Sequence, residues 1–243
     1  MLRSVDKPTI GLLLSGGLDS CILLSHLLDQ QHRVTPIYID SGLAWQAEER
    51  QAVHRYLHAI RYLNAIRPGR PGRLGELVIL ELPLEDLYGN HWSVTGEQAP
   101  DETTPDEAVY LPGRNPLLII KAALWCQMHG VETLALAPLG SNPFPDATDE
   151  FFATFEASLN MATRSALRIV RPFAQLEKRD VMELGRDQPL QHTFSCISPV
   201  RGRHCGHCNK CAERRAAFAC IGTSDPTRYA DVSPAVIHQR LFL

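Results

Sequence analysis

Short apolar runs alternate along the chain with longer segments in which apolar residues recur every three or four positions. The runs predict buried strands at residues 9–14, 34–39, 77–82, 133–137 and 167–170. The longer segments predict helices at residues 21–28, 45–66, 115–130, 148–161 and 177–185, with one more helix leading towards Cys220. Strands that alternate with helices build parallel sheets covered on both faces. We therefore expect an α/β fold with a doubly wound, mainly parallel sheet.

Several segments between these elements are rich in turn-forming residues. Residues 67–73 form a basic, turn-rich stretch, and residues 143–146 predict a turn. Residues 83–111 are polar and partly acidic, which predicts a long surface loop, and loops of this length in a compact domain often cover a site. No internal repeat is visible, and no linker clearly separates two domains.

Composition indicates a folded globular protein, with 44% hydrophobic and 21% charged residues in a chain of 243. The net charge of −3 excludes binding to nucleic acid or to an anionic membrane through bulk positive charge, so an anionic ligand must be held by local groups. No apolar stretch is long enough to span a bilayer, and the first residues lack the apolar core of a signal peptide. We expect a cytoplasmic protein with no membrane partner.

A glycine-containing loop joins the first strand to the first helix. Its residues are Ser15, Gly16, Gly17, Leu18, Asp19 and Ser20. Backbone N–H groups at such a junction, together with the positive end of a helix, cradle phosphate oxygens, and Asp19 can orient the loop or help to hold Mg²⁺. The spacings of the Walker loop and of the dinucleotide fingerprint are absent. The alternative is a tight turn whose Ser or Asp caps the helix.

Four of the seven cysteines lie within sixteen residues, and the other three stand alone. The clustered cysteines have the spacing of a tetrahedral zinc site, and four thiolates leave no open position for water. This cluster predicts a structural zinc ion held by Cys196, Cys205, Cys208 and Cys211, the alternative being reactive or incidental thiols. His204 and His207 are then expected beside the ligands or on the surface. Small buried side chains are expected at Cys21, Cys126 and Cys220.

Two further positions carry candidate chemistry. Arg114 and Asn115 follow a Pro-Gly turn just before a helix, where the planar fork of Arg114 can clamp a carboxylate or a phosphate. The alternative is a solvated Arg114 and a helix cap by Asn115. Asp40 follows the second strand, at the sheet edge where such folds bind nucleotides, unless it is only a turn residue.

The loop and its context resemble the pyrophosphate loop of the ATP pyrophosphatases, the PP-loop superfamily that includes GMP synthetase, asparagine synthetase and lysidine synthetase. Further motifs follow in the order seen in the 7-cyano-7-deazaguanine synthase family (QueC, also ExsB). They are residues 112–115, Asp146 with residues 150–151, Lys178, and the four clustered cysteines. This resemblance covers most of the chain and implies an adenine nucleotide alpha hydrolase-like sheet with a C-terminal zinc module. We expect residues 1–190 to form the ATP-binding domain, and residues 191–243 to form the zinc module and a tail packed on the same core.

The resemblance implies an ATP-dependent ligase. In that family the carboxylate of 7-carboxy-7-deazaguanine is adenylated, ammonia displaces AMP to give an amide, and a second adenylation permits dehydration to the nitrile. ATP, Mg²⁺ and a structural Zn²⁺ are the implied cofactors, and the carboxylate substrate and ammonia are the implied partners. A homodimer is also implied, with the apolar tail at residues 236–243 as a candidate contact, unless the tail packs on its own subunit.

The residue roles follow from the same resemblance. The nucleotide is expected to bind Ser15, Gly16, Gly17, Leu18, Asp19, Ser20 and Asp40. The residues expected to act on the reacting groups are Asp19, Arg114 and Lys178, although Lys178 can instead lie on a solvated helix face. The substrate is expected to contact Arg114, Asn115, Phe144 and Asp146.

The match departs from the family in the stretch that contacts the deazapurine. Tyr, Cys and Arg of the family pattern are replaced by Phe144, Ala147 and Thr148. One open hypothesis is therefore a related enzyme that adenylates a different substrate. Another is a non-catalytic zinc ribbon that binds RNA or protein through the basic residues around the cysteines, namely Arg201, Arg203, His204, His207, Lys210, Arg214 and Arg215.

Overall fold

The computed structural model describes residues 7–66 and 72–230. Within these residues, six strands form one sheet in which every pairing is parallel, as expected from the apolar runs. The strands are β1 (Thr9–Leu13), β2 (Arg33–Asp40), β3 (Arg73–Leu74), β4 (Val78–Glu81), β5 (Thr133–Ala135) and β6 (Arg168–Val170). The order across the sheet is β3-β2-β1-β5-β6, and β4 also pairs with β2.

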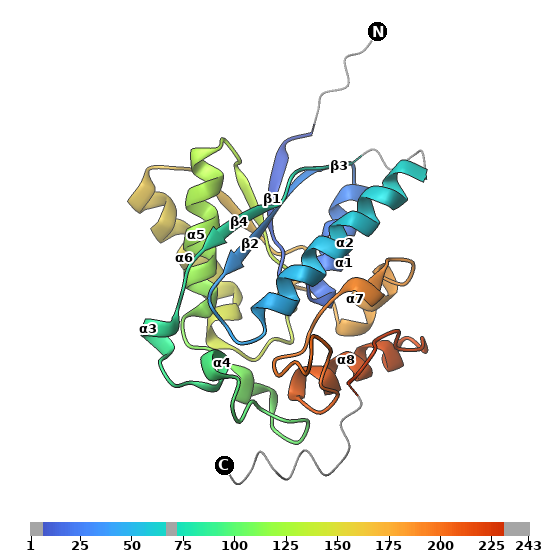
Figure 1. Cartoon of the computed structure of the whole chain (residues 1–243). Coiled ribbons are helices and arrows are strands. Elements are labelled where there is room, and N and C mark those ends of the chain that lie inside the picture. The colour runs from blue at the N-terminus through green and yellow to red at the C-terminus, as the bar shows by residue number, and fades with distance from the viewer. Residues whose placement is uncertain (1–6, 67–71, 231–243) are drawn as a thin grey trace.

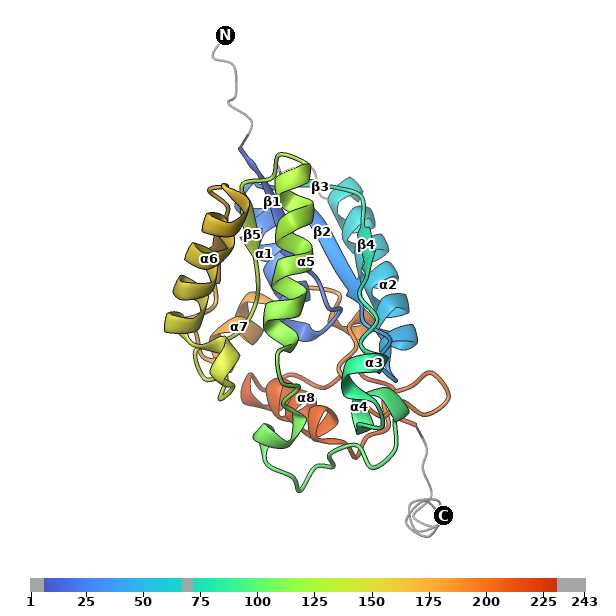
Figure 2. The ribbon, with the colours of Figure 1, turned by 90° about the vertical axis from the view of Figure 1, so that its left-hand side faces the viewer.

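Helices cover both faces of this sheet (Figures 1 and 2). One face carries α1 (Leu18–Asp29), α2 (Gln46–Ile66) and α7 (Lys178–Leu184), and the other carries α5 (Arg114–Met128) and α6 (Asp149–Thr163). None of the described helices combines the length and apolar composition needed to cross a bilayer. The doubly wound α/β prediction is confirmed.

Alternate side chains of β1 and β2 enter two apolar layers. Leu12 of β1 and Tyr38 of β2 pack with residues of α1, α2 and α7. Ile37 and Ile39 of β2 pack instead with residues of α5 and α6. Because successive strand residues point to opposite faces, a sheet covered on both sides requires the uninterrupted apolar runs seen in the sequence.

The segment at residues 83–111 has more structure than the expected surface loop. It contains α3 (Glu85–Tyr88), α4 (Trp92–Thr95) and the 3₁₀ turn η1 (Asp106–Val109). The segment is held against the cysteine region by backbone hydrogen bonds from Glu102 N to His207 O (2.9 Å) and from Asn209 N to Pro100 O (3.0 Å). The prediction of a long surface loop did not include these short helices, which tertiary contacts stabilise because they are too short to form alone.

Strand β3 is also absent from the sequence prediction, since its two residues lie at the end of the turn-rich stretch. Residues 67–71 of that stretch, and the tail at residues 236–243, lie outside the described residues. The turn expected at residues 143–146 becomes the 3₁₀ turn η2 (Pro145–Ala147).

The C-terminal region packs on the main core. It comprises η3 (Leu190–His192), the cysteine segment and α8 (Asn209–Cys220). Ala217 and Phe218 of α8 belong to the same apolar cluster as α1 and α7. Cys220 is exposed at the end of α8, so the expectation of a buried thiol holds for Cys21 and Cys126 but is wrong for Cys220. The boundary at residue 190 stays a prediction.

Candidate active site

The loop between β1 and α1 has a backbone that only glycine accommodates well at its second position. Gly16 has φ +82°, and a Cβ there would lie 3.0 Å from Val53 Cγ2 and 3.2 Å from Glu49 O. Gly17 is the N-cap of α1 and no side chain caps the helix, so the alternative of a Ser- or Asp-capped turn is wrong. The amide end of α1 is therefore available to an anion.

The loop hydroxyls are turned towards one another. Ser15 Oγ and Ser20 Oγ lie 3.1 Å apart, and Gly17 N donates to Ser15 Oγ at 3.4 Å. Ser20 Oγ also donates to Gly17 O at 3.3 Å. These contacts hold the loop in one shape before a ligand arrives.

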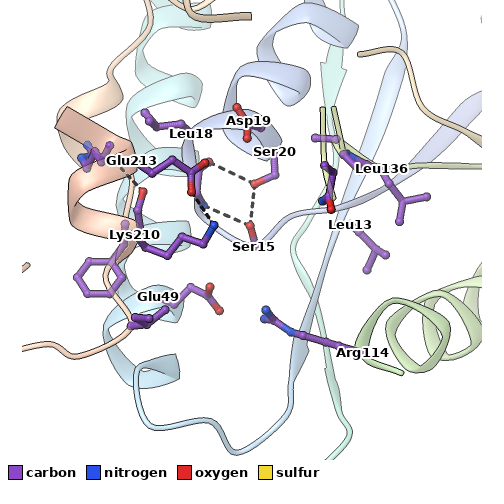
Figure 3. A pocket seen from close by; sticks show the side chains of 18 of the residues that line it. Leu13, Ser15, Leu18, Asp19, Ser20, Glu49, Arg114, Leu136, Lys210 and Glu213 are labelled. Carbon is purple, nitrogen blue, oxygen red and sulfur yellow. Dashed lines mark hydrogen bonds and ion pairs between the residues drawn. The ribbon is translucent and has the colours of Figure 1, made fainter. Parts of the chain in front are cut away.

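The loop opens into a cavity of about 350 Å³ between the sheet edge, α2, α5 and the cysteine region (Figure 3). Residues expected from the sequence that line it are Ser15, Gly17, Leu18, Asp19, Ser20, Arg114, Asn115 and Lys178. A second cavity of about 460 Å³ shares Asp19 and Lys178 with the first and is lined by Phe144.

Alternating charges surround the loop. Lys178 Nζ donates to both carboxylate oxygens of Asp19 at 2.8 Å and lies 3.6 Å from Glu213 Oε1. Lys210 Nζ donates to Glu213 Oε2 at 2.5 Å. Burial lowers the pKa of Lys178, but the charges of Asp19 and Glu213 together outweigh burial and raise it. Lys178 therefore stays cationic beside the loop rather than on a solvated helix face.

Arg114 is the first residue of α5 and extends into the cavity from the side opposite Lys210 (Figure 3). Its guanidinium lies 5.9 Å from the ring centre of Trp45, and its buried Nε has no hydrogen-bond partner. An unpaired buried donor of this kind is costly unless a ligand satisfies it. The solvated alternative for Arg114 does not describe this placement.

Asn115 and Asp146 bind each other. Asn115 Nδ2 donates to Asp146 Oδ1 at 3.2 Å and to Asp146 O at 3.0 Å, and Asn115 N donates to Asp146 Oδ2 at 3.3 Å. The helix N-cap is Gly113, so Asn115 does not cap α5. Burial raises the pKa of Asp146, and the bonds from Asn115 oppose that effect.

Three of the residues expected to contact the nucleotide or the substrate do not line either cavity. Asp40 lies 3.3 Å from Arg50 and accepts a hydrogen bond from Gly42 N at 3.4 Å, which is the behaviour of a turn residue. Asp146 is buried behind Asn115. Gly16 is a loop residue whose carbonyl oxygen accepts a hydrogen bond from Phe194 N at 2.8 Å.

Sequence reasoning did not assign four charged residues of the cavity to this site, namely Glu49, Lys210, Glu213 and Arg214. Glu49 had a detectable signal, because it stands in helical register with the buried positions Val53, Tyr56 and Ile60 of α2. A carboxylate on the apolar face of a helix points to a polar site in the interior.

The four clustered cysteines form a metal-type site. All four sulfurs are buried and lie within 4.8 Å of one another, with Cys196–Cys208 at 3.8 Å and Cys205–Cys211 at 3.9 Å. A Zn–S bond of about 2.3 Å in a tetrahedron places sulfurs about 3.8 Å apart, so the set fits Zn²⁺. Backbone N–H groups of Cys205 and Cys208 donate to these sulfurs at 3.3 Å, which favours the thiolate form. The predicted clustering of these four cysteines is confirmed, and its geometry is consistent with a zinc module.

The two nearby histidines lie outside the sulfur set. His204 Nε2 accepts the N–H of Ser195 at 3.1 Å, and burial followed by the charge of Arg214 lowers its pKa to about 3, so His204 is neutral. His207 Nδ1 lies 3.2 Å from Cys205 O. Both act beside the ligands, as expected.

Most of the basic residues around the cysteines form hydrogen bonds or ion pairs with other residues of the protein. Arg214 is 1% exposed and donates to Thr193 Oγ1 at 2.8 Å and to Leu190 O at 3.1 Å. Arg215 pairs with Glu102 at 2.6 Å, and Lys210 pairs with Glu213. These contacts argue against the hypothesis of a free basic surface for RNA or protein.

The parallel sheet, the amide end of α1 without a side-chain cap and the charged residues around it define a protein with a PP-loop type of fold. One solved structure with this fold, a 4-thiouridine synthetase in complex with RNA and bound ATP, aligns with a TM-score of 0.50 and 16% identity. The alignment covers 96% of this chain and half of that chain.

A comparison of the sequence with protein-family models places the chain in one family. The family model described as queuosine biosynthesis protein QueC matches residues 10–222, and the chain belongs to that family. Curated relatives include the 7-cyano-7-deazaguanine synthase of Solidesulfovibrio magneticus, 30% identical with 93% of this chain and 98% of the relative covered. The protein of the same name from Syntrophobacter fumaroxidans is 28% identical over 89% of this chain and 94% of the relative.

Proposed function

We propose that the protein is an ATP-dependent 7-cyano-7-deazaguanine synthase, which converts 7-carboxy-7-deazaguanine and ammonia to the nitrile. The observation that carries the proposal is the cavity in which the PP-loop, Lys178 and Arg114 meet. The names of the curated relatives support the choice of reaction.

ATP is proposed to bind with its pyrophosphate on the amide end of α1. The Lys178–Asp19 pair lies at one side of the loop. A polyphosphate offers Lys178 more negative charge than one carboxylate does, so Lys178 is expected to turn towards it. Mg²⁺, when bound, neutralises phosphate charge, and Asp19 and Glu213 are the carboxylates beside the loop that fit it.

Arg114 is proposed to hold the reacting carboxylate against the α-phosphate. Its planar fork matches carboxylate and phosphate oxygens, and its unpaired Nε supplies a donor that a ligand can satisfy. The protein offers no nucleophile of its own in this scheme. It contributes positioning and charge stabilisation, both of which are sufficient for acyl and phosphoryl transfer.

The altered stretch after residue 141 bears on the alternative of a different substrate. Thr148 caps α6 by accepting Phe151 N at 3.1 Å, and the Ala147 side chain is buried. Neither residue lines a cavity, whereas Phe144 does and keeps an aromatic face there. The lost thiol and positive charge therefore fall at positions away from the cavities, which supports the deazapurine substrate.

The test measures AMP and pyrophosphate from ATP, Mg²⁺, ammonium and 7-carboxy-7-deazaguanine, with mass detection of the amide and the nitrile. Nitrile formation, with strong loss in Lys178→Met and little change in the matched control Lys121→Met, is the expected result. Pyrophosphate release with another acid but not with the deazapurine acid would favour the alternative substrate. Formation of ADP alone would overturn both.

A further inference from the structure

Glu49 is a buried carboxylate that lines the proposed reaction cavity and has no role in the scheme above. It is 8% exposed, and its carboxylate points into the same space as the guanidinium of Arg114 (Figure 3). The other carboxylates of this cavity, Asp19 and Glu213, are ion-paired with lysines. Among the described residues that line the cavity, Glu49 is the carboxylate without an ion pair.

A chain of hydrogen bonds fixes the position of Glu49. Tyr38 Oη donates to Glu49 Oε2 at 3.0 Å, and Gln46 Nε2 donates to Tyr38 Oη at 3.2 Å. Gln46 is itself held by the backbone, because its Oε1 accepts Ser41 N at 2.6 Å and Leu43 N at 2.8 Å. Glu49 is therefore preorganised by the β2–α2 junction rather than free to rotate into solvent.

A structural role does not account for a carboxylate here. Glutamine has an amide oxygen in the same place that accepts the Tyr38 hydrogen bond, without the cost of burying an ionisable group. Burial raises the pKa of Glu49 to about 7, although the charge of Arg114 and the hydrogen bonds from Tyr38 and Trp45 act to lower it. A buried acid that titrates near neutrality, in a cavity, is suited to proton transfer.

Resting on the proposed function, we propose that the Glu49 carboxylate binds ammonium in the cavity and accepts its proton, so that neutral ammonia attacks the acyl-adenylate. Arg114, which we assign to the substrate carboxylate, faces Glu49 across this space. In this proposal the electrophilic carbon and the ammonium site face each other within one cavity.

The step balances as follows. Ammonium transfers one proton to the Glu49 carboxylate, and the freed lone pair forms the C–N bond at the acyl carbon. The C–O bond to the phosphate of AMP breaks, and AMP leaves with that electron pair. The surplus proton on the new amide nitrogen passes to the departing phosphate, and Glu49 returns its proton to water. No oxidant or reductant is needed.

The protonation of Glu49 depends on every charged group around it. These groups are Tyr38 and Asp40 of β2, Arg114 of α5, and Asp19, Lys178, Lys210, Glu213 and Arg214 across the cavity. Asp40 raises the pKa and Arg114 lowers it. A bound substrate that draws Arg114 away therefore makes Glu49 a stronger base when ammonia is required.

The test separates adenylate formation from the use of ammonium. Hydroxylamine is mainly unprotonated at neutral pH, so it traps the acyl-adenylate as a hydroxamate without needing a base. We expect Glu49→Gln to form hydroxamate close to the wild-type rate but to lose about 100-fold or more in kcat/KM for ammonium. Glu49→Asp is expected to regain part of the loss, and the neighbouring variant Glu48→Gln to behave as wild type.

A pH profile supplies the second readout. At fixed total ammonium, the ratio of the wild-type rate to the Glu49→Gln rate is expected to fall as the pH increases above about 7. The variant depends on free ammonia, which keeps increasing with pH, whereas the wild-type rate gains nothing more once Glu49 is ionised. A merely structural role does not produce this change.

Three outcomes overturn the inference. If Glu49→Gln uses ammonium normally while forming hydroxamate, the ammonium role is wrong and the proposed function stands. If hydroxamate and amide formation fall together, Glu49 serves adenylation or folding instead. If wild-type protein forms no hydroxamate with the deazapurine acid, the proposed function fails first.

Discussion

Replacing Glu49 by Gln is expected to stabilise the protein at neutral pH although it removes a residue of the proposed reaction cavity. Burial raises the pKa of Glu49 from its ordinary value of 4.5 to about 7 in the folded protein. Below pH 4.5 both the folded and the unfolded chain hold this proton. As the pH rises, the unfolded chain releases it first, so the free energy of unfolding falls until the folded chain also ionises near pH 7.

The size of the effect follows from the two pKa values. Each pKa unit corresponds to about 1.4 kcal/mol, so the wild-type protein loses about 3 kcal/mol through this group between those pH values. Gln keeps an acceptor for the Tyr38 hydroxyl and does not titrate. The free energy of unfolding of Glu49→Gln relative to wild type should therefore increase by about 3 kcal/mol over the same range.

Urea denaturation at several pH values, with zinc present throughout, measures this difference directly. Comparison of the two proteins cancels the other titrating groups, and Glu48→Gln removes the same kind of side chain outside the cavity. A constant difference between Glu49→Gln and wild type across the range would refute the reasoning. It would mean that Glu49 is ionised in the folded protein at acidic pH, and the proton-transfer inference would lose its electrostatic support.

Three further predictions concern the frame of the site. Arg214→Met leaves buried acceptors unpaired and should lower the free energy of unfolding by about 3 kcal/mol or more. Arg215→Met removes a half-exposed ion pair and should lower the free energy of unfolding by about 1 kcal/mol or less. Urea denaturation measures both changes. Cys208→Ser should lower the zinc content measured by elemental analysis, and it should weaken ATP binding in calorimetry because the cysteine region lines the cavity. Gly16→Ala should weaken ATP binding with little loss of secondary structure, since a Cβ at φ +82° would press on Val53, and unchanged affinity would contradict the assigned loop geometry.

The fold and the metal site were predictable because their signals are local. Apolar runs of strand length and helical periodicity report burial directly, and four closely spaced cysteines can close around one ion with little help from the rest of the chain. The PP-loop was also predictable, since one short segment contains the strand end, the glycines and the helix start.

The rest of the site depends on packing that a local pattern does not encode. Glu49 acquires its place only when α2 packs behind the PP-loop, and Lys210 and Glu213 arrive on a helix nearly two hundred residues away in sequence. Asp40 was expected to contact the nucleotide but does not line the cavity. Its position at the carboxyl edge of the sheet does not decide whether its side chain enters the cavity or closes a turn. The short helices of residues 83–111 went unpredicted because their stability comes from docking.

The hydrogen bond from Phe194 N to Gly16 O also bears on biosynthesis of the protein on the ribosome. The PP-loop emerges from the ribosome well before the segment that completes its cavity. At a translation rate of about 10 residues per second, roughly 20 seconds separate the two. Until that segment emerges, the growing chain has no complete cavity. A ligand of this cavity therefore cannot assist early folding and stabilises only a chain that has been synthesised through its cysteine region.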